Sequence, residues 1–135
     1  MWLKAADLMA GKYRQELNAA TMLGQSKTVI QAEIDAAAEL IDFLRFNAYY
    51  AQQAIKWQPV SPDKSSTLNS IRWRGLEGFV AAVSPFNFTA IGGNLAYTPA
   101  MMGNCVLQRV VLVAMSVYAW VLKCNSDIGT ACYSA

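Results

Sequence analysis

The residues best suited to chemistry are Ser-Pro-Phe-Asn at positions 84–87, which directly follow an apolar run. The run, residues 79–83, predicts a strand covered on both faces, and residues 91–102 predict a short helix after the turn. In open α/β sheets, ligands bind at the carboxyl ends of strands, where a helix N-terminus presents free N–H groups. At such a turn the amide of Asn87 can hold a cofactor or polarise a substrate oxygen. The pattern alone nevertheless favours a simpler role, in which Asn87 caps the helix through its side chain.

The residue types that are missing exclude several kinds of chemistry. The sequence has no histidine, the commonest general base and metal ligand. Its three cysteines, Cys105, Cys124 and Cys132, form no CxxC pair, so no metal site is expected and free thiols are the default. The alternative to free thiols is a disulfide between Cys124 and Cys132. A net charge of +2 without a block of like charge predicts no nucleic-acid partner.

Two further segments predict structure rather than function. Residues 24–28, Gly-Gln-Ser-Lys-Thr, lack the glycine before Lys27 and the preceding strand that a phosphate-binding loop requires, so we expect backbone and capping features. The apolar run at residues 110–122 is shorter than the roughly 20 residues that span a bilayer as a helix. It predicts buried structure and no membrane insertion. No targeting sequence is recognisable at the N-terminus.

Helices are expected in the first third of the sequence, at residues 2–9, 13–23 and 28–48. Thr28 and Gln31 have the spacing of a capping box at the start of the third helix. Its apolar residues recur at three- and four-residue steps along one stripe, formed by Ile30, Ile34, Ala37, Ile41, Leu44 and Ala48. Its acidic residues lie mostly off that stripe and predict a solvated face: Glu33, Asp35, Glu39 and Asp42.

Strands are expected in the second half of the sequence. Prolines and serines at residues 58–70 predict an exposed connection, and the alternation at residues 70–74 predicts a half-buried strand. After the turn at residues 75–78, the strand, helix and second strand at residues 105–107 make residues 79–107 a β-α-β unit. This unit is typical of a larger nucleotide-binding α/β fold.

Three segments of the sequence resemble the aldehyde dehydrogenase superfamily. They are residues 28–43, which begin Thr-Val-Ile-Gln-Ala-Glu-Ile-Asp, residues 74–82 and residues 84–94. The resemblance extends over about residues 1–107, and the Ser-Pro-Phe-Asn-Phe block at residues 84–88 is its most specific part. It implies an α/β fold in which N-terminal helices precede part of a Rossmann-like NAD-binding domain, present here incompletely.

The resemblance also implies an activity, the NAD-dependent oxidation of the small-molecule aldehyde L-glutamate γ-semialdehyde to glutamate in proline breakdown. By position in the motif, Asn87 would donate to the aldehyde oxygen as part of an oxyanion hole. Ser84 would contact the cofactor, with Pro85 and Phe86 lining the same turn. In the family the nucleophile is a cysteine and the base a glutamate, both far downstream, and neither is recognised here. The resemblance further implies a mitochondrial matrix location and a homo-oligomer.

The tail departs from the family pattern after residue 107. Residues 108–111, Gln-Arg-Val-Val, stand where the family has Trp-Lys-Pro-Ser. Arg109 therefore takes the position of the lysine that binds the adenosine ribose of NAD, with a longer, forked side chain. The expected organisation is a helical segment at residues 1–57, a linker and strand at 58–78, a partial NAD-binding unit at 79–123 and a divergent tail at 124–135.

Two hypotheses follow from these observations. The favoured one is an N-terminal piece or truncated isoform of the dehydrogenase that has no turnover alone, because the catalytic cysteine and glutamate are absent. The alternative is a non-catalytic interaction module, or an aggregation-prone truncated product, that pairs with full-length subunits through open strand edges and exposed apolar faces.

Overall fold

The computed structural model describes residues 1–109. Three expectations concern residues outside that range: the apolar run at residues 110–122, the divergent tail at residues 124–135, and the state of Cys124 and Cys132. Within residues 1–109, no helix has the length and apolar character needed to cross a membrane.

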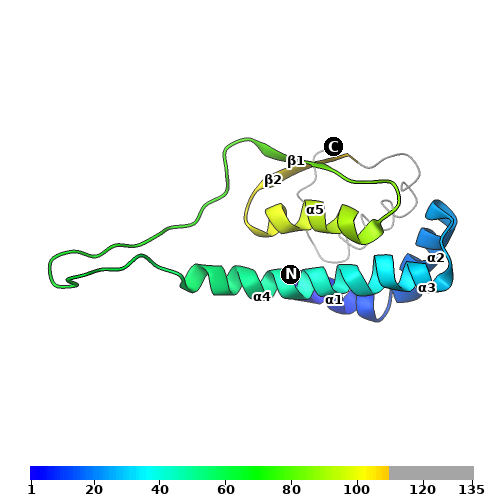
Figure 1. Cartoon of the computed structure of the whole chain (residues 1–135), viewed down its shortest axis with the longest axis horizontal. Coiled ribbons are helices and arrows are strands. Elements are labelled where there is room, and N and C mark those ends of the chain that lie inside the picture. Colours follow the sequence, from blue (N-terminus) through cyan, green and yellow to red (C-terminus); the bar gives the residue numbers. More distant parts are fainter. Residues whose placement is uncertain (110–135) are drawn as a thin grey trace.

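Two short helices open the chain, as predicted. α1 (Trp2–Ala10) ends at Gly11, and α2 (Arg14–Gln25) ends before Ser26, which has a left-handed backbone conformation with φ of 53°. Both helices pack against the helical segments that follow, residues 29–56 (Figure 1). The apolar spacing therefore predicted both helices, although α2 continues beyond residue 23, where its end was predicted.

The third predicted helix is continuous but has three parts. They are α3 (Val29–Ala32), the π-helical segment η1 (Glu33–Ala38) and α4 (Glu39–Lys56), together called the long helix. The capping box at its start is confirmed: Gln31 N donates to Thr28 Oγ1 at 3.3 Å, and Thr28 N donates to Gln31 Oε1 at 3.0 Å. The long helix extends beyond the end predicted at residue 48.

The π-helical segment changes which residues of the long helix are buried. Its i→i+5 hydrogen bonds rotate the residues before it relative to those after it, compared with a regular 3.6-residue period. Ala37, Ile41 and Leu44 are buried as predicted, but Ile30 and Ile34 are exposed. The predicted stripe is therefore wrong at its N-terminal end, because one helical period was assumed across the π turn.

The predicted β-α-β unit is confirmed. β1 (Phe79–Val83) and β2 (Cys105–Arg109) are parallel neighbours, and α5 (Thr89–Met101) connects them. In register, Phe79 lies opposite Cys105 and Val83 lies opposite Arg109. Figure 1 shows α5 between the two strands and the long helix, so the described residues form a layered α/β arrangement.

β1 is less covered than the sequence predicted. Phe79 and Val83 are 64% and 65% exposed, and only Ala82 in this strand is buried. α5 packs on one face of the strand pair, and no other element of residues 1–109 covers the opposite face. The expectation of a strand covered on both faces is wrong for the described part of the chain.

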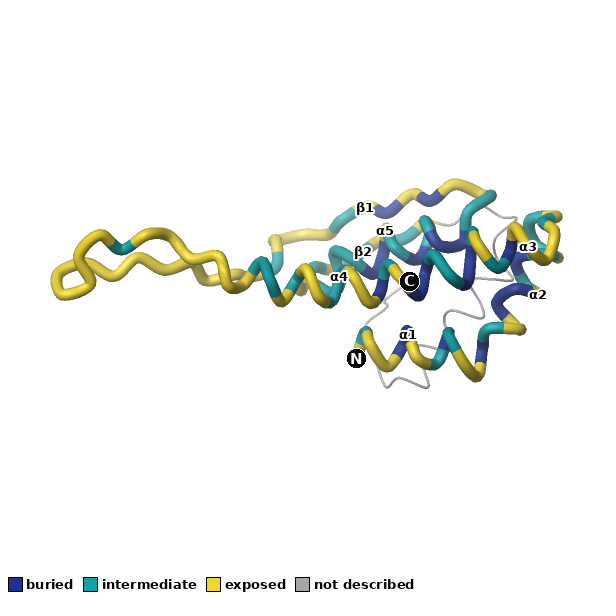
Figure 2. Tube along the Cα trace, turned by 60° about the horizontal axis from the view of Figure 1, so that its bottom comes forward, coloured by how far each residue is buried: buried dark blue, intermediate teal, exposed yellow. Residues whose placement is uncertain are grey.

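Residues 57–74 form an exposed excursion that extends away from the other elements (Figures 1 and 2), and it returns to them at Leu76, whose N donates to Oδ1 of Asn104 at 2.8 Å. The exposed connection predicted at residues 58–70 is confirmed. The strand predicted at residues 70–74 is wrong, because this segment has no strand partner among the described residues. Its Ile71 N instead donates to Oε1 of Gln58 at 2.8 Å.

The core lies where α1, α2, the long helix and α5 meet, and Figure 2 shows buried residues on the facing sides of these helices. The largest fully buried side chains are Met9, Leu17, Thr21 and Leu40. Full burial of an apolar side chain such as Met9, Leu17 or Leu40 stabilises a fold by about 1.5–3 kcal/mol. The core therefore fixes α5, and with it the turn at residues 84–88, against the long helix.

A glycine allows α5 to approach the long helix closely. A Cβ at Gly93 would lie 2.5 Å from Cδ1 of Leu40, which is fully buried. At the adjacent Gly92, the nearest atoms to a Cβ would be the Ser84 side chain at 3.5 Å, an ordinary contact distance. The two glycines thus differ in how much space surrounds them.

We expect Gly93→Ala to lower the free energy of unfolding by about 1–3 kcal/mol, because Leu40 must move within a packed core. The matched control, Gly92→Ala, should be neutral or stabilising by up to about 1 kcal/mol, because alanine favours a helix more than glycine does. Urea unfolding of the two purified variants measures the difference. Equal stability of the two variants would contradict the close approach of α5 to Leu40.

Candidate functional site

The carboxyl ends of the two strands bring two of the predicted cofactor residues together. Ser84 directly follows β1 and Arg109 ends β2, and Ser84 N donates to the carbonyl oxygen of Arg109 at 3.3 Å. Ser84 is only 3% exposed, whereas Arg109 is exposed. Parallel pairing places these residues at one edge of the sheet, which is where α/β folds bind ligands.

The turn between β1 and α5 presents the remaining predicted site residues. Pro85 and Phe86 are exposed, and Asn87 is half-buried. The N-cap of α5 is Phe88, and no side chain makes a cap hydrogen bond there. The capping role that the pattern favoured for Asn87 is therefore wrong, and its amide is not committed to the helix end.

A polar network holds the start of α5 against α2. Oγ1 of Thr89 lies 3.2 Å from Oγ1 of Thr21 and accepts a hydrogen bond of 2.8 Å from Nε2 of Gln25. Both threonines are buried. Because these partners are more than 60 residues apart, no local signal in the sequence could have revealed the network.

A second connection joins β2 to α5. Nε2 of Gln108 donates to the carbonyl oxygen of Gly92 at 2.8 Å. Gln108 stands at the position where the resemblance led us to expect tryptophan. The strand end and the first turns of α5 are thereby fixed relative to each other on the side of the turn that carries Ser84.

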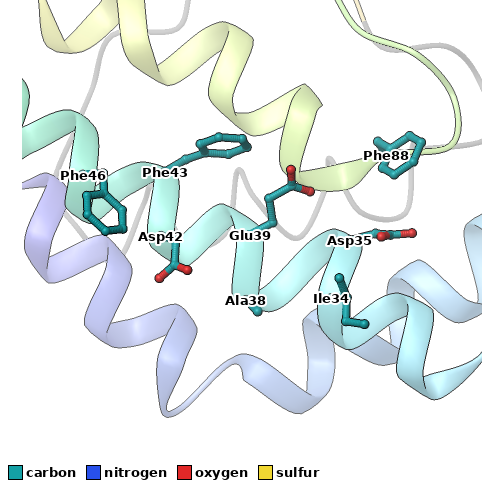
Figure 3. A pocket seen from close by; sticks show the side chains of 8 residues that line it. All are labelled: Ile34, Asp35, Ala38, Glu39, Asp42, Phe43, Phe46 and Phe88. Carbon is teal, nitrogen blue, oxygen red and sulfur yellow. The ribbon is translucent and has the colours of Figure 1, made fainter.

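A pocket of about 610 Å³ lies on the other side of the turn, between the long helix and Phe88 (Figure 3). Figure 3 shows Glu39 and Phe43 rising from α4 on the side of α5 where Phe88 lies. The residues that line the pocket are apolar or acidic: Ile34, Asp35, Ala38, Glu39, Asp42, Phe43, Phe46 and Phe88. Apolar walls with a few polar groups are typical of small-molecule sites.

Two acidic residues of the long helix form ion pairs and hydrogen bonds, whereas the sequence predicted a solvated face. Asp35 pairs with Lys27, whose Nζ lies 2.7 Å from Oδ2 of the aspartate. Glu33 accepts hydrogen bonds from Arg14 and Asn18 of α2. The solvated-face prediction is wrong for Glu33 and Asp35. It missed their partners because these lie in a helix and a loop that fold back from earlier in the sequence.

The described cysteine lies away from the turn. Cys105 is free and exposed, and it begins β2 opposite Phe79, at the amino edge of the strand pair. A five-residue strand is about 13 Å long at roughly 3.3 Å per residue, so Cys105 is separated from Ser84 by the length of the strand. Among the described residues, no cluster of His, Cys, Asp and Glu has the arrangement of a metal site.

Comparison with known proteins gives the class to which this fold and site belong. A sequence model of the aldehyde dehydrogenase family matches residues 1–129. The chain belongs to the aldehyde dehydrogenase family, which confirms the resemblance and the fold expected from it.

The similar relatives within this family share one name, delta-1-pyrroline-5-carboxylate dehydrogenase. The chain is 61% identical to the mitochondrial protein of Homo sapiens over 122 residues, covering 87% of this chain and 21% of the relative. It is 57% identical to the mitochondrial protein of Danio rerio over 129 residues, covering 96% of this chain and 23% of the relative.

A solved structure shares the fold over the same span. The crystal structure of the Mycobacterium tuberculosis Delta-pyrroline-5-carboxylate dehydrogenase bound with NAD superposes with a TM-score of 0.90 at 47% identity, over 96% of this chain and 24% of that chain. The chain thus spans about a fifth to a quarter of the length of these relatives. Because every one of these relatives is named as a dehydrogenase, the interaction-module alternative is not favoured.

The Arg14–Glu33 pair makes one part of the structure depend on pH. Hydrogen bonds from Arg14 and then Asn18 lower the pKa of Glu33 below its usual value of 4.5. A carboxyl group whose pKa is lower in the folded than in the unfolded state stabilises the fold above its unfolded pKa. It loses that contribution as the pH falls through the folded pKa.

We expect Glu33→Gln to lower the free energy of unfolding at pH 7 by about 0.5–1 kcal/mol, because the pair is partly exposed and solvent screens it. The difference from the unsubstituted chain should shrink as the pH falls below about 4.5. Urea unfolding between pH 3 and pH 7 gives the profile. The control is Glu77→Gln, at the largely exposed Arg74–Glu77 pair, which should change the free energy of unfolding at pH 7 less than Glu33→Gln does. A Glu33→Gln difference that is constant with pH would argue against the pair.

Proposed function

We propose that this chain contributes the substrate- and cofactor-binding turn of an NAD-dependent dehydrogenase that oxidises L-glutamate γ-semialdehyde to glutamate. One observation carries the proposal. The half-buried Asn87 lies between a strand edge formed by Ser84 and Arg109 and a pocket bordered by Phe88. The names of the relatives give delta-1-pyrroline-5-carboxylate, the cyclic imine of this semialdehyde, and a mitochondrial location, and both support the proposal. A homo-oligomeric state stays a prediction from the resemblance.

In this reaction Asn87 stabilises charge on the aldehyde oxygen. A thiolate adds to the aldehyde carbon, and the carbonyl electron pair moves onto the oxygen. The side-chain N–H groups of Asn87 bind the resulting oxyanion more tightly than the neutral carbonyl, which lowers the barrier. Bound NAD would supply an acceptor for the hydride that leaves this carbon, and Ser84, Pro85, Phe86 and Arg109 are the residues that would hold it; water would then cleave the thioester to the carboxylate and release the thiol.

The strand edge fits a dinucleotide cofactor. Ser84 is buried beside α5, and the exposed Pro85 and Phe86 offer an apolar surface next to it. Arg109 adds an exposed cation beside Ser84, and its guanidinium can donate to ribose hydroxyls or phosphate oxygens. We assign these four residues to NAD binding and none to a metal.

The pocket suits one part of the aldehyde substrate. Phe43, Phe46 and Phe88 provide apolar walls for a short carbon chain, while Glu39 and Asp42 favour an ammonium group. L-Glutamate γ-semialdehyde has both features and also a carboxylate, which these acidic side chains repel, so its carboxylate end would lie outside the pocket. Asn87 does not line the pocket but immediately precedes Phe88, which does.

A chimera tests the assignment of Asn87. Residues 1–109 of this chain replace the matching segment of the human relative, and NADH production from the semialdehyde is measured. We expect turnover, and we expect Asn87→Ala to lower kcat by about 10²–10³-fold, the usual effect of losing one oxyanion donor. The control is Asn69→Ala, in the exposed excursion, which should leave kcat unchanged. A folded chimera without turnover, or an Asn87→Ala variant with full turnover, would refute the proposal.

The purified chain by itself is expected to produce no NADH from the semialdehyde. Among the described residues, none is placed to supply the thiolate, because Cys105 lies at the opposite edge of the strand pair. Sustained turnover, above the background of heat-denatured chain, would show that the thiolate is supplied within these 135 residues.

A further inference from the structure

Lys27 occupies a position that is unusual for a lysine. It lies in the short connection between α2 and α3, yet its side chain is only 11% exposed. Lysine side chains are almost never buried unless they are paired, because removing the ammonium from water is costly. A lysine side chain with so little exposure in a surface connection therefore requires specific partners.

Two partners surround the ammonium, and both line the pocket. Nζ of Lys27 lies 2.7 Å from Oδ2 of Asp35 and 4.1 Å from the centroid of the Phe88 ring. Attraction between a cation and an aromatic face strengthens when the pair is shielded from water. Asp35 offsets the charge, while the ring of Phe88 receives the cation on its face.

The ring that receives the cation belongs to Phe88, the residue next to Asn87 of the proposed site. Phe88 follows Asn87 and is the N-cap of α5, with an extended backbone at φ −135° and ψ 104°. The Thr21–Thr89–Gln25 network holds the residue after Phe88 through its side-chain oxygen. The Lys27 ammonium, in contrast, lies over the ring itself.

We propose that Lys27, held by Asp35, is a positioning residue that fixes the Phe88 ring as a wall of the pocket and so sets the direction of the Asn87 amide. This inference rests on the proposed function for its catalytic consequence. The contact with Phe88 does not depend on that function and is tested separately. Lys27 itself touches neither aldehyde nor cofactor.

Three variants separate positioning from simple charge balance. Lys27→Met removes the cation and leaves Asp35 without its partner. The double variant Lys27→Met/Asp35→Asn also removes the cation but restores charge balance. Lys27→Arg keeps a cation that can stack on an aromatic ring.

The first measurement uses the chain itself, labelled at phenylalanine for NMR. We expect the ring signals of Phe88, assigned with Phe88→Leu, to shift in Lys27→Met and in the double variant and to stay close to their original positions in Lys27→Arg. Lys27→Met should lower the unfolding midpoint, and the double variant should restore it. If the Phe88 ring signals do not change in Lys27→Met, the proposed contact is overturned. It is also overturned if they change in Lys27→Met but return to their original positions in the double variant.

The second measurement uses the chimera with the human relative. We expect Lys27→Met and the double variant to lower kcat by about tenfold, because small displacements of catalytic groups cost up to about 10²-fold in rate. Lys27→Arg should stay within about twofold. Full kcat in the double variant, in a chimera that turns over, would overturn the positioning role even if the ring signals shift. A chimera with no turnover before substitution refutes the proposed function instead, and the NMR measurement still decides the contact.

Discussion

The close approach of α5 to the long helix at Gly93 and Leu40 is the constraint on which the rest of the site depends. A Cβ at position 93 would lie 2.5 Å from Cδ1 of the fully buried Leu40, so any residue larger than glycine requires the leucine side chain to move. This contact holds α5, which begins after Phe88, against α4, which carries Phe43, and both phenylalanines line the pocket (Figure 3). Helix packing therefore determines where Asn87 lies, and the turn alone does not.

The π-helical segment η1 is the second constraint, because it carries two carboxylates with different partners: residues two apart on a helix do not share a face. Glu33 reaches Arg14 and Asn18 on α2, whereas Asp35, two residues later, reaches Lys27 and the pocket. π-helical turns are rare and often lie at functional sites. Here the segment connects the packing of α2 to one wall of the pocket.

Local patterns predicted the elements, and the resemblance predicted the turn, but neither predicted contacts between distant segments. The capping box at Thr28 and the β-α-β unit were confirmed because each depends on neighbouring residues. The strand predicted at residues 70–74 was wrong, since alternation indicates a strand only where a partner strand is available. The low exposure of the Lys27 side chain was missed because its partners Asp35 and Phe88 are brought to it only by folding.

The four residues from Ser84 to Asn87 separate two kinds of binding surface. Ser84 is held at the strand edge by the carbonyl of Arg109, whereas Phe88, one residue after Asn87, faces the pocket of the long helix. A cofactor at the edge and an aldehyde in the pocket would therefore approach Asn87 from opposite ends of the turn. Hydride transfer requires that the two molecules meet at one carbon while the aldehyde oxygen stays within reach of a donor. A short, rigid turn whose two ends are fixed by different elements meets that requirement better than a flexible loop, because each end can be held without displacing the amide.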